Sequence, residues 1–320
     1  MPRAERPDAV FLIAFGGPEG PDDVLPFLRN VTRGRNVPDA RLAHVAKHYD
    51  AVGGVSPINR LTRELVAAIR TEMDVRGLQS VPLAWGSRNW HPFAVEGLRP
   101  LIDEGGANHL LTVPAAAYDC YSTNGQYRED MACALDELGA AGDVEVDWVP
   151  PYWDTPGFLE ANARAVAEVL RGADPAATRL LLVTHSIPVA MDDESGPPRY
   201  SEQHLAFAEA LVPRIREILG GPVPEWQLTY SCRSGPPHQP WLEPSTEDAI
   251  RAAAADGASA VCLAPIGFIA DHMEVAYDLD VEAAEVAASE GLAYSRAATA
   301  GTDPAFVSAL VNLIEERLTA

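Results

Sequence analysis

Short apolar runs alternate with longer amphipathic stretches along most of the chain. The runs are five to seven residues long and rich in Val, Leu, Ile and aromatic residues. Continuous apolar runs of this length, separated by helical stretches, are typical of parallel strands that are covered on both faces. The eight predicted strands are 9–15, 80–85, 109–114, 144–150, 179–185, 226–231, 260–265 and 292–296.

The stretches between the runs predict helices, several of which stop at a glycine that can serve as a C-terminal cap. They are 24–31, 60–77, 126–142, 157–173, 201–221 and 245–257. The strands fall into two sets of four, separated by "PPYWDTPGF" at 150–158.

This alternation predicts an α/β protein with two Rossmann-like lobes, each a parallel four-stranded sheet flanked by helices. We place the first lobe at 1–155 and the second at 156–302. The amphipathic stretch within 303–320 is expected to be a helix that packs back on the first lobe. Ligands of such folds bind beyond the carboxyl ends of the strands, and here we also expect a cleft between the lobes.

Composition and charge narrow the possible partners. The 320 residues are 47% apolar and 22% charged, and the formal net charge is −22. This balance argues against nucleic acid and against docking to anionic lipid, because both need a basic face. No signal-peptide pattern opens the chain, and its longest nearly apolar stretch, 257–270, is too short to cross a bilayer. We therefore expect a cytoplasmic protein without integral membrane association.

Candidate functional residues lie at or just after the carboxyl ends of two predicted strands. His185 closes the run "RLLLVTH", and the run at 260–265 leads into "IGFIADHME", which contains His272 and Glu274. An imidazole and a carboxylate brought together suit a loosely held divalent cation, whereas two protein ligands are too few for structural zinc. His185 as a core histidine bonded to backbone is the plainer alternative.

Further carboxylates follow Glu274 at spacings of four, four and three residues, namely at Asp278, Glu282 and Glu285. Such spacings place the acidic groups on one face of a helix, where like charges repel. A solvated acidic face is the alternative interpretation in a chain this acidic. The charge balance is reversed between residues 29 and 48, where five cations (Arg29, Arg33, Arg35, Arg41 and Lys47) accompany one anion, Asp39. That segment indicates an anionic ligand or simply a basic surface helix.

Five motifs in order, "FGGPEG", "HYDAVGGVSPIN", "THSIP", "SGPPHQPWLEP" and "GFIADHMEVAYDLDVEA", resemble those of the ferrochelatases. The resemblance runs from about residue 9 to the C-terminus. Within the family the chain is most similar to the coproporphyrin III ferrochelatases of Gram-positive bacteria, particularly the actinobacterial branch. It implies a lyase that inserts Fe²⁺ into a porphyrin during haem biosynthesis, with iron as substrate and no organic cofactor.

The resemblance also implies residue roles. His185 and Glu274 match the family's essential histidine and carboxylate, and are therefore its catalytic and metal-binding candidates. Asp278 and Glu282 match an acidic line that leads away from the site. The substrate-binding candidates are Phe15, where some relatives have tyrosine, Arg33 and Arg35 in the matching basic segment, His48, Tyr49 and Ser56 at propionate-binding positions, and Tyr127 at a porphyrin contact.

Several alternatives stay open. The substrate of a ferrochelatase could be protoporphyrin IX, and a related chelatase would insert cobalt into sirohydrochlorin. A non-catalytic carrier of tetrapyrrole or metal, and a metal-dependent hydrolase, are the options from other classes. We expect a monomer acting on coproporphyrin III and Fe²⁺.

The four cysteines, Cys120, Cys133, Cys232 and Cys262, form no C-x-x-C pair, so they indicate neither a zinc knuckle nor a redox dithiol, and buried thiols are favoured. Some relatives hold a 2Fe–2S cluster through one cysteine before "QYRE" and three near the C-terminus. Asn124 stands near the first of these positions and no cysteine follows Cys262. No 2Fe–2S cluster is predicted.

Overall fold

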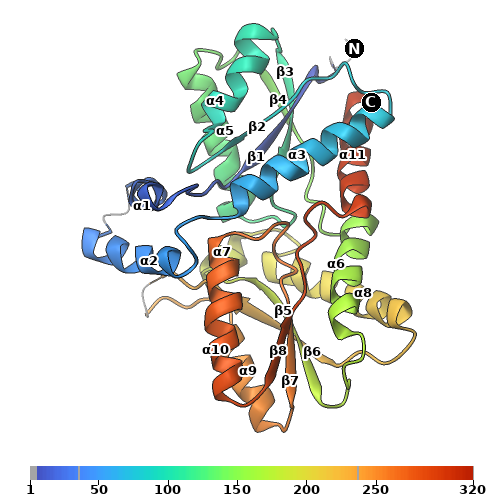
Figure 1. Ribbon diagram of the computed structural model, residues 1–320. Coiled ribbons are helices and arrows are strands. Elements are labelled where there is room, and N and C mark those ends of the chain that lie inside the picture. Colours follow the sequence, from blue (N-terminus) through green and yellow to red (C-terminus); the bar gives the residue numbers. More distant parts are fainter. Residues whose placement is uncertain (1–5, 35–36, 236–237, 320) are drawn as a thin grey trace. The chain divides into compact units, whose positions relative to one another are not determined.

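The chain divides into two compact units in the computed structural model, which describes residues 6–34, 37–235 and 238–319. Unit 1 comprises Met1–Ala116, Ser122–Tyr152 and Val307–Ala320. Unit 2 comprises Ala117–Tyr121 and Trp153–Phe306. Each unit has its own sheet and its own apolar core (Figure 1).

Both sheets are four-stranded, entirely parallel and identical in topology, with orders β2-β1-β3-β4 and β6-β5-β7-β8. The strands of unit 1 are β1 (Ala9–Ala14), β2 (Leu83–Ser87), β3 (His109–Pro114) and β4 (Glu145–Trp148). Those of unit 2 are β5 (Thr178–His185), β6 (Glu225–Ser231), β7 (Ala260–Ala264) and β8 (Ala293–Arg296). The predicted fold class of two parallel α/β lobes is confirmed.

The second strand begins later than the sequence pattern suggests. The run at 80–85 contains Pro82, which has no N–H to give to a ladder. Pairing with β1 therefore starts at Leu83 and continues through Gly86 to Ser87, although the carbonyl of Pro82 still accepts a hydrogen bond from Val10 N at 2.9 Å.

Helices cover both faces of the unit 1 sheet, which explains why every residue of β1 is buried. One core cluster joins Phe11 and Leu110 of the sheet to α4 (Ala94–Arg99) and α5 (Gln126–Glu137). The remaining helices of this unit are α1 (Val24–Val31), α2 (Asp39–Ala51), α3 (Ile58–Val75) and most of α11 (Pro304–Thr319), with short turns at Pro21–Asp23, Pro100–Glu104 and Tyr121–Gly125. Arg76, just after α3, binds Ser308 and Asn312 of α11, so these two helices are held together.

The unit 2 sheet is covered in the same way. Its core cluster packs Val183 of β5 and Leu263 of β7 against helices that follow β6 and β7, namely α9 (Thr246–Ala255), η4 (Val275–Ala283) and α10 (Ala284–Ser289). On the other face lie α6 (Pro156–Leu170) and α8 (Tyr200–Leu219), which pack on each other (Figure 1). The short α7 (Val189–Glu194) follows β5.

A buried histidine ties α8 to the end of β5. The His204 side chain is inaccessible to solvent; its Nδ1–H donates to the Tyr200 carbonyl at 2.8 Å, and its Nε2 accepts from Thr184 Oγ1 at 2.7 Å. The ring stacks on Tyr118 with centroids 3.6 Å apart. Because burial outweighs the hydrogen bond to the Tyr200 carbonyl, the pKa of His204 falls from 6.5 to about 3. His204 is therefore a structural, neutral residue that sequence reasoning did not identify.

Replacing His204 should change how stability depends on pH. The unfolded chain binds a proton at this position below pH 6.5 and the folded chain does not, so stability present at neutral pH is lost as the pH falls. Between pH 7.5 and 5 this group alone should remove about 2 kcal/mol from the free energy of unfolding. We expect His204→Gln to be less stable at pH 7.5 but to lack this part of the pH slope in urea denaturation. The exposed His238→Gln should keep the wild-type slope, and an unchanged slope in His204→Gln would contradict the assignment.

Candidate functional site

The topology of unit 2 selects one edge of its sheet as the candidate site. The chain passes from β5 to β6 on one side and then returns to β7 on the other side of β5. The segments that follow β5 and β7 therefore diverge, and such a switch point opens a crevice beyond the carboxyl ends of the two strands. His185 is the last residue of β5, and Glu274 lies ten residues after the end of β7, where η4 begins.

A glycine lets the segment after β7 lie directly against β5. Gly267 N donates to the Val183 carbonyl at 3.1 Å. A Cβ atom on Gly267 would stand 2.3 Å from Thr184 Oγ1 and 2.7 Å from Thr184 Cα, which is closer than atoms can approach. Thr184 itself is fixed by His204, so the turn has little room to move away. This contact brings the segment that carries Glu274 to the residue next to His185.

An arginine at the end of β8 fixes the other part of this segment. Arg296 Nη2 binds Asp271 Oδ2 at 3.0 Å, and its Nε binds Asp280 Oδ1 at 2.6 Å. The Arg296 side chain is largely buried, so both ion pairs are partly shielded from water. Asp271 and Asp280 flank the start of η4, and Arg296 therefore holds the turn and the helix in one position.

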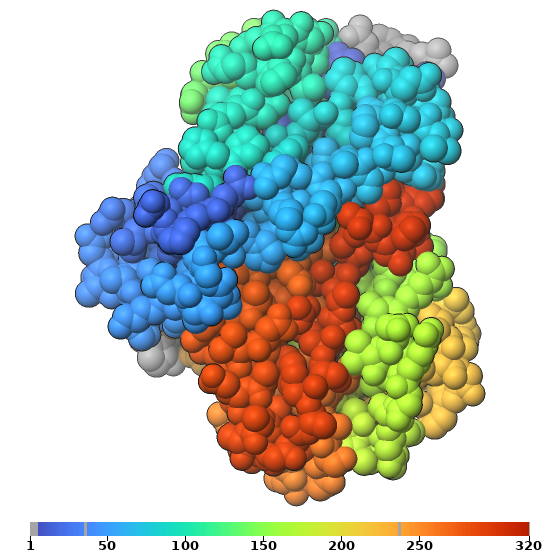
Figure 2. All heavy atoms as spheres, viewed as in Figure 1, coloured from blue at the N-terminus to red at the C-terminus, as the bar shows by residue number. Residues whose placement is uncertain are grey.

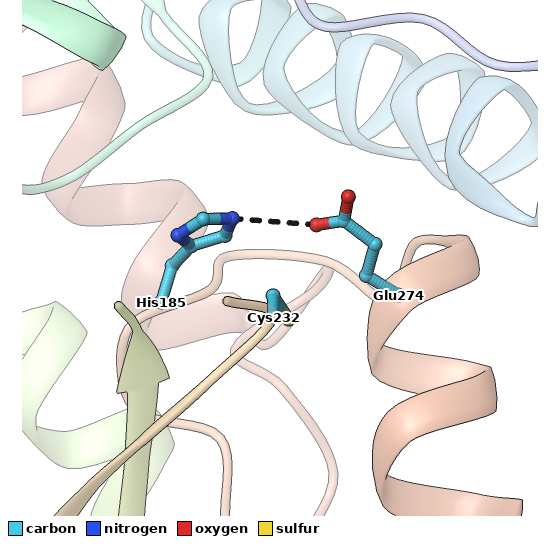
Figure 3. A group of neighbouring side chains, drawn as sticks. All are labelled: His185, Cys232 and Glu274. Carbon is cyan, nitrogen blue, oxygen red and sulfur yellow. Dashed lines mark ion pairs between the residues drawn. The ribbon is translucent and has the colours of Figure 1, made fainter. Parts of the chain in front are cut away.

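His185 and Glu274 face each other at the switch point, with His185 Nε2 3.4 Å from Glu274 Oε2 (Figure 3). The other ring nitrogen, Nδ1, is 2.5 Å from the carbonyl of Ser186, so it carries the proton of the neutral ring. The carbonyl of His185 accepts from Tyr200 Oη at 3.1 Å. About a third of the His185 side chain and half of the Glu274 side chain remain exposed, so both are open to a ligand.

The two groups stabilise each other's charged forms. Burial works against the charge of Glu274, but the hydrogen bond and charge of His185, with smaller contributions from His272 and Cys232, lower the pKa of Glu274 to about 2. Burial likewise opposes the protonation of His185, but the Glu274 carboxylate outweighs it and raises the pKa of His185 above 6.5. His272 accepts a hydrogen bond from Glu274 N at 3.2 Å, and burial lowers the pKa of its ring.

Asp278 and Glu282 lie on the π-helix η4 and Glu285 on the α-helix α10 that follows it, whereas the sequence spacing suggested one ordinary helix. Over Val275–Ala283 the chain forms i→i+5 hydrogen bonds, so each turn holds more residues than in an α-helix. Asp278 and Glu282 are half-buried. Burial and the charge of Glu274 raise the pKa of Asp278 to about 7, and burial with the charges of Glu247 and Glu285 raises the pKa of Glu282. Glu285 is exposed.

Two predicted substrate-binding motifs lie against each other in unit 1. Gly17 N donates to Asn59 Oδ1 at 3.1 Å, and Asn59 Nδ2 donates back to the Gly17 carbonyl at the same distance. Ser56 N donates to the Pro18 carbonyl at 2.9 Å, and a Cβ on Gly17 would stand 2.7 Å from Ser56 Cβ. The loop after β1 and the loop before α3 therefore form one surface, in which Ser56 is buried.

Aromatic side chains gather beside this surface. Phe27 contacts the rings of Phe15, Tyr49 and Trp90 with centroids 6.4, 6.1 and 6.1 Å away. Phe15 is exposed, whereas Tyr49 is buried. Phe27 and Trp90 were missed by sequence reasoning, although Trp90 comes only three residues after the end of β2. Tyr127 is buried in the core of unit 1 beside Phe11 and Met131.

The basic segment lies at the surface of unit 1, on and around α1 and α2, whose atoms are the blue region in Figure 2. Arg33 is exposed, and its guanidinium donates to Asn30 Oδ1. His48 is half-buried near the end of α2, and burial, with the charges of His44 and Arg41, lowers the pKa of its ring. Arg35 lies outside the described residues. The helix α2 was not among the predicted helices because its apolar positions are few, although a basic surface helix was one of the two interpretations of this segment.

Cys232 is the functional candidate that sequence reasoning missed. Its Sγ, a nitrogen of His185 and a carboxylate oxygen of Glu274 all lie within 4.8 Å of one another. Among the described His, Cys, Asp and Glu residues, this is the one group of three or more that could hold a metal ion. No motif revealed it; the one signal in the sequence is that Cys232 directly follows a predicted strand, 226–231.

No helix within the described part of the chain is long and apolar enough to cross a membrane.

Comparison with known sequences gives consistent results. The sequence model of the family described as Ferrochelatase matches residues 7–318. A protein named coproporphyrin III ferrochelatase from Leifsonia xyli is 44% identical over 97% of this chain and 84% of its own length. The same name is carried by a relative from Streptomyces coelicolor, 44% identical over 97% of this chain and 85% of its own. A protein named ferrochelatase from Rhodopirellula baltica is 41% identical over 97% of this chain and 86% of its own.

Solved structures share the fold at much lower sequence identity. A structure of SirB from Bacillus subtilis with Fe³⁺ is 12% identical and gives a TM-score of 0.57, covering 97% of this chain and 95% of SirB. SirB from Bacillus subtilis subspecies spizizenii, a sirohydrochlorin chelatase in complex with cobalt, is 11% identical with a TM-score of 0.52, covering 97% and 94%. At these identities the similarity establishes the fold.

A methyl group on Gly267 should disturb the site. We expect Gly267→Ala to lower the free energy of unfolding by about 1–3 kcal/mol, the usual cost of overpacking, and to weaken binding of divalent metal ions, because the segment that carries Glu274 must move off Thr184. Gly221→Ala is the matched control, since no atom lies within 4 Å of its added Cβ. Urea denaturation and calorimetric titration with Co²⁺ would measure both effects. Wild-type stability and metal affinity in Gly267→Ala would show that this contact does not position the site.

Proposed function

The chain belongs to the ferrochelatase family, and on that premise we propose that it inserts ferrous iron into coproporphyrin III, giving Fe-coproporphyrin III for haem biosynthesis. The observation that carries the proposal is the pair of His185 Nε2 and Glu274 Oε2, 3.4 Å apart at the switch point of the unit 2 sheet. The names of the relatives that are 44% identical over 97% of the chain support the choice of macrocycle.

The reaction requires a base and a place for the metal. Fe²⁺ replaces the two pyrrole N–H protons of the porphyrin, so two protons must leave for each iron inserted. In its neutral form His185 presents the lone pair of Nε2, because Nδ1–H is engaged with Ser186. Glu274 favours the protonated imidazole and therefore makes His185 a better proton acceptor. With its pKa of about 2, Glu274 stays a carboxylate at neutral pH and can also bind the incoming iron.

The outer acidic line gives the protons a way out. The pKa of Asp278, about 7, lets this carboxyl both accept and release a proton under physiological conditions. Glu282 lies farther along the same helix and is half-buried. We propose that Asp278 and Glu282 carry protons from the His185–Glu274 pair to solvent and attract hydrated Fe²⁺ in the opposite direction.

The residues of unit 1 that match the family's porphyrin contacts keep that role in the proposal. Coproporphyrin III carries four propionates and protoporphyrin IX carries two, so the former calls for more cationic donors. The exposed Arg33 and the rest of the basic segment meet that need, with His48, Tyr49 and Ser56 at the propionate positions. The exposed ring of Phe15 can pack on the flat macrocycle. Arg35 and Tyr127 complete the proposed set.

A ferrochelatase acting on protoporphyrin IX is the second candidate, because the name of the relative from Rhodopirellula baltica, ferrochelatase, states no macrocycle. We further propose that the enzyme acts in the cytoplasm as a monomer and contains no 2Fe–2S cluster. Iron–sulfur absorption bands in the purified protein would contradict the last point.

Substrate choice and the role of the pair can be tested together. We expect kcat/KM for coproporphyrin III to exceed that for protoporphyrin IX by at least about tenfold, because two further propionates are recognised.

His185→Ala and Glu274→Gln should each lower kcat by about 100-fold or more while porphyrin still binds in a fluorescence titration. Glu285→Gln, at an exposed position, is the matched control and should keep wild-type activity. Porphyrin binding without metal insertion in the wild type would favour a carrier instead.

The coupling between His185 and Glu274 predicts a pH effect. Glu274 raises the pKa of His185, so the wild type should lose kcat/KM as the pH falls through that raised value and the base becomes protonated. In Glu274→Gln, burial is opposed only by the hydrogen bond to Ser186 and the charge of Asp278, so the pKa of His185 should be lower than in the wild type. NMR titration of the imidazole, assigned with His185→Gln, would measure this shift directly. The same pKa in Glu274→Gln and the wild type would rule out the proposed coupling.

A further inference from the structure

Cys232 occupies a backbone position that places its thiol beside the His185–Glu274 pair. Ser231, the last residue of β6, is the register partner of His185 on β5, and Cys232 is the next residue. Neighbouring strands lie about 4.8 Å apart, so a residue at this point borders the His185 side chain. Figure 3 shows the three side chains coming from the end of β5, the chain after β6 and the start of η4.

The chain bends sharply at this cysteine. Cys232 has a φ of +64° and is the one non-glycine residue in the described part of the chain with a positive φ. A non-glycine side chain in this left-handed region costs about 1 kcal/mol or more, and such strain is retained where the surrounding structure holds it. The turn is held by Ser231, whose Oγ lies 3.2 Å from Cys232 Sγ and whose carbonyl accepts from Ser186 N at 2.8 Å. Cys232 is thus directed to the site by the backbone.

The spacing of the three donor atoms fits a metal ion. Around a tetrahedral ion with bonds of about 2.0–2.1 Å to nitrogen and oxygen and about 2.3 Å to sulfur, donor atoms stand roughly 3.3–3.6 Å apart. The nitrogen and oxygen of the pair already lie 3.4 Å apart, and the sulfur lies within 4.8 Å of both. Three corners of the tetrahedron are occupied once the sulfur stands about 3.6 Å from the other two donors, and the fourth corner is then open.

Sulfur changes which ions this site prefers. Imidazole and carboxylate alone suit Fe²⁺ and other borderline ions, whereas a thiolate favours thiophilic ions such as Zn²⁺. We propose that Cys232 is a third metal donor at this site and that its sulfur makes the site a high-affinity site for Zn²⁺, which thereby competes with Fe²⁺. On binding, a Zn–S bond forms, the S–H bond breaks and the proton leaves to water, while the zinc keeps its oxidation state.

The binding of Zn²⁺ does not depend on the proposed function, whereas its competition with iron insertion rests on that function. Binding and inhibition are therefore measured separately. A chain that binds Zn²⁺ through Cys232 but inserts no iron would leave the site assignment intact and defeat the enzymatic proposal. A chain that inserts iron but binds Zn²⁺ without Cys232 would keep the enzymatic proposal and defeat the assignment of Cys232 as a metal donor.

Direct binding is tested on the full chain with Zn²⁺ and with Co²⁺ as a spectroscopic probe. We expect Cys232→Ser to raise the Kd for Zn²⁺ at least about tenfold and to abolish the sulfur-to-cobalt charge-transfer absorption seen with the wild type. Cys133→Ser, at an exposed cysteine of unit 1, is the matched control and should keep both properties. The wild type should also release one more proton per Zn²⁺ than Cys232→Ser in titrations in buffers of different ionisation enthalpy. Equal Kd values and equal cobalt spectra in the wild type and Cys232→Ser would overturn the proposal.

A measurement on the unaltered protein covers the case in which Cys232→Ser does not fold. X-ray absorption at the zinc edge of the wild type with one equivalent of Zn²⁺ should show a sulfur neighbour at about 2.3 Å together with nitrogen or oxygen neighbours. A first shell of nitrogen and oxygen alone would overturn the proposal. In the iron-insertion assay, the Zn²⁺ concentration that halves each variant's own rate should rise at least about tenfold in Cys232→Ser. If this Zn²⁺ concentration were the same in Cys232→Ser and the wild type, Cys232 would take part in Zn²⁺ binding only, and the proposed competition with Fe²⁺ would be overturned.

Discussion

The contact between the turn at Gly267 and Thr184 is the constraint on which the candidate site depends. Strands β5 and β7 are parallel neighbours, so their carboxyl ends lie at the same edge of the sheet. Only a residue without a side chain lets the segment after β7 pass over the end of β5 at hydrogen-bonding distance. Glu274 then begins its helix opposite His185, and Arg296 keeps the helix there through Asp271 and Asp280.

The electrostatics of unit 2 follow from this placement. The imidazole of His185 faces a helix that begins with Glu274 and continues with further carboxylates. Glu274 lies beside the imidazole, so its charge is compensated, whereas the charges of the carboxylates farther along the helix are not. Glu274, next to His185, stays ionised well below neutral pH, while burial and the negative charge of Glu274 raise the pKa of Asp278 to about 7. A strongly retained charge beside one that changes readily suits a site that receives a cation and gives up protons. The buried, neutral His204 behind Thr184 provides support and takes no part in that exchange.

Much of the architecture could be predicted from the sequence, because its signals are local. The central strands β1 and β5 carry nearly continuous apolar runs and are buried along almost their whole length, and a strand buried on both faces leaves such a run wherever it occurs. His185 and Glu274 could be selected as candidates because each follows a predicted strand and because the motifs around them resemble a family. The start of β2, set by Pro82, and the helix α2, with few apolar positions, were less visible because their signals are weak or mixed.

The sequence by itself determined the fold class, the two sets of four strands and the family resemblance, and it singled out His185 and Glu274 as candidates. Only the tertiary structure decided which groups meet. Strand order put the ends of β5, β6 and β7 side by side, and register placed Cys232, 47 positions after His185 in the chain, next to it. It also decided that Asp278 and Glu282 stand on a π-helix and that Tyr127 is buried. These features depend on pairing and packing between distant segments, and no local pattern of hydrophobic and polar residues records which segments pair.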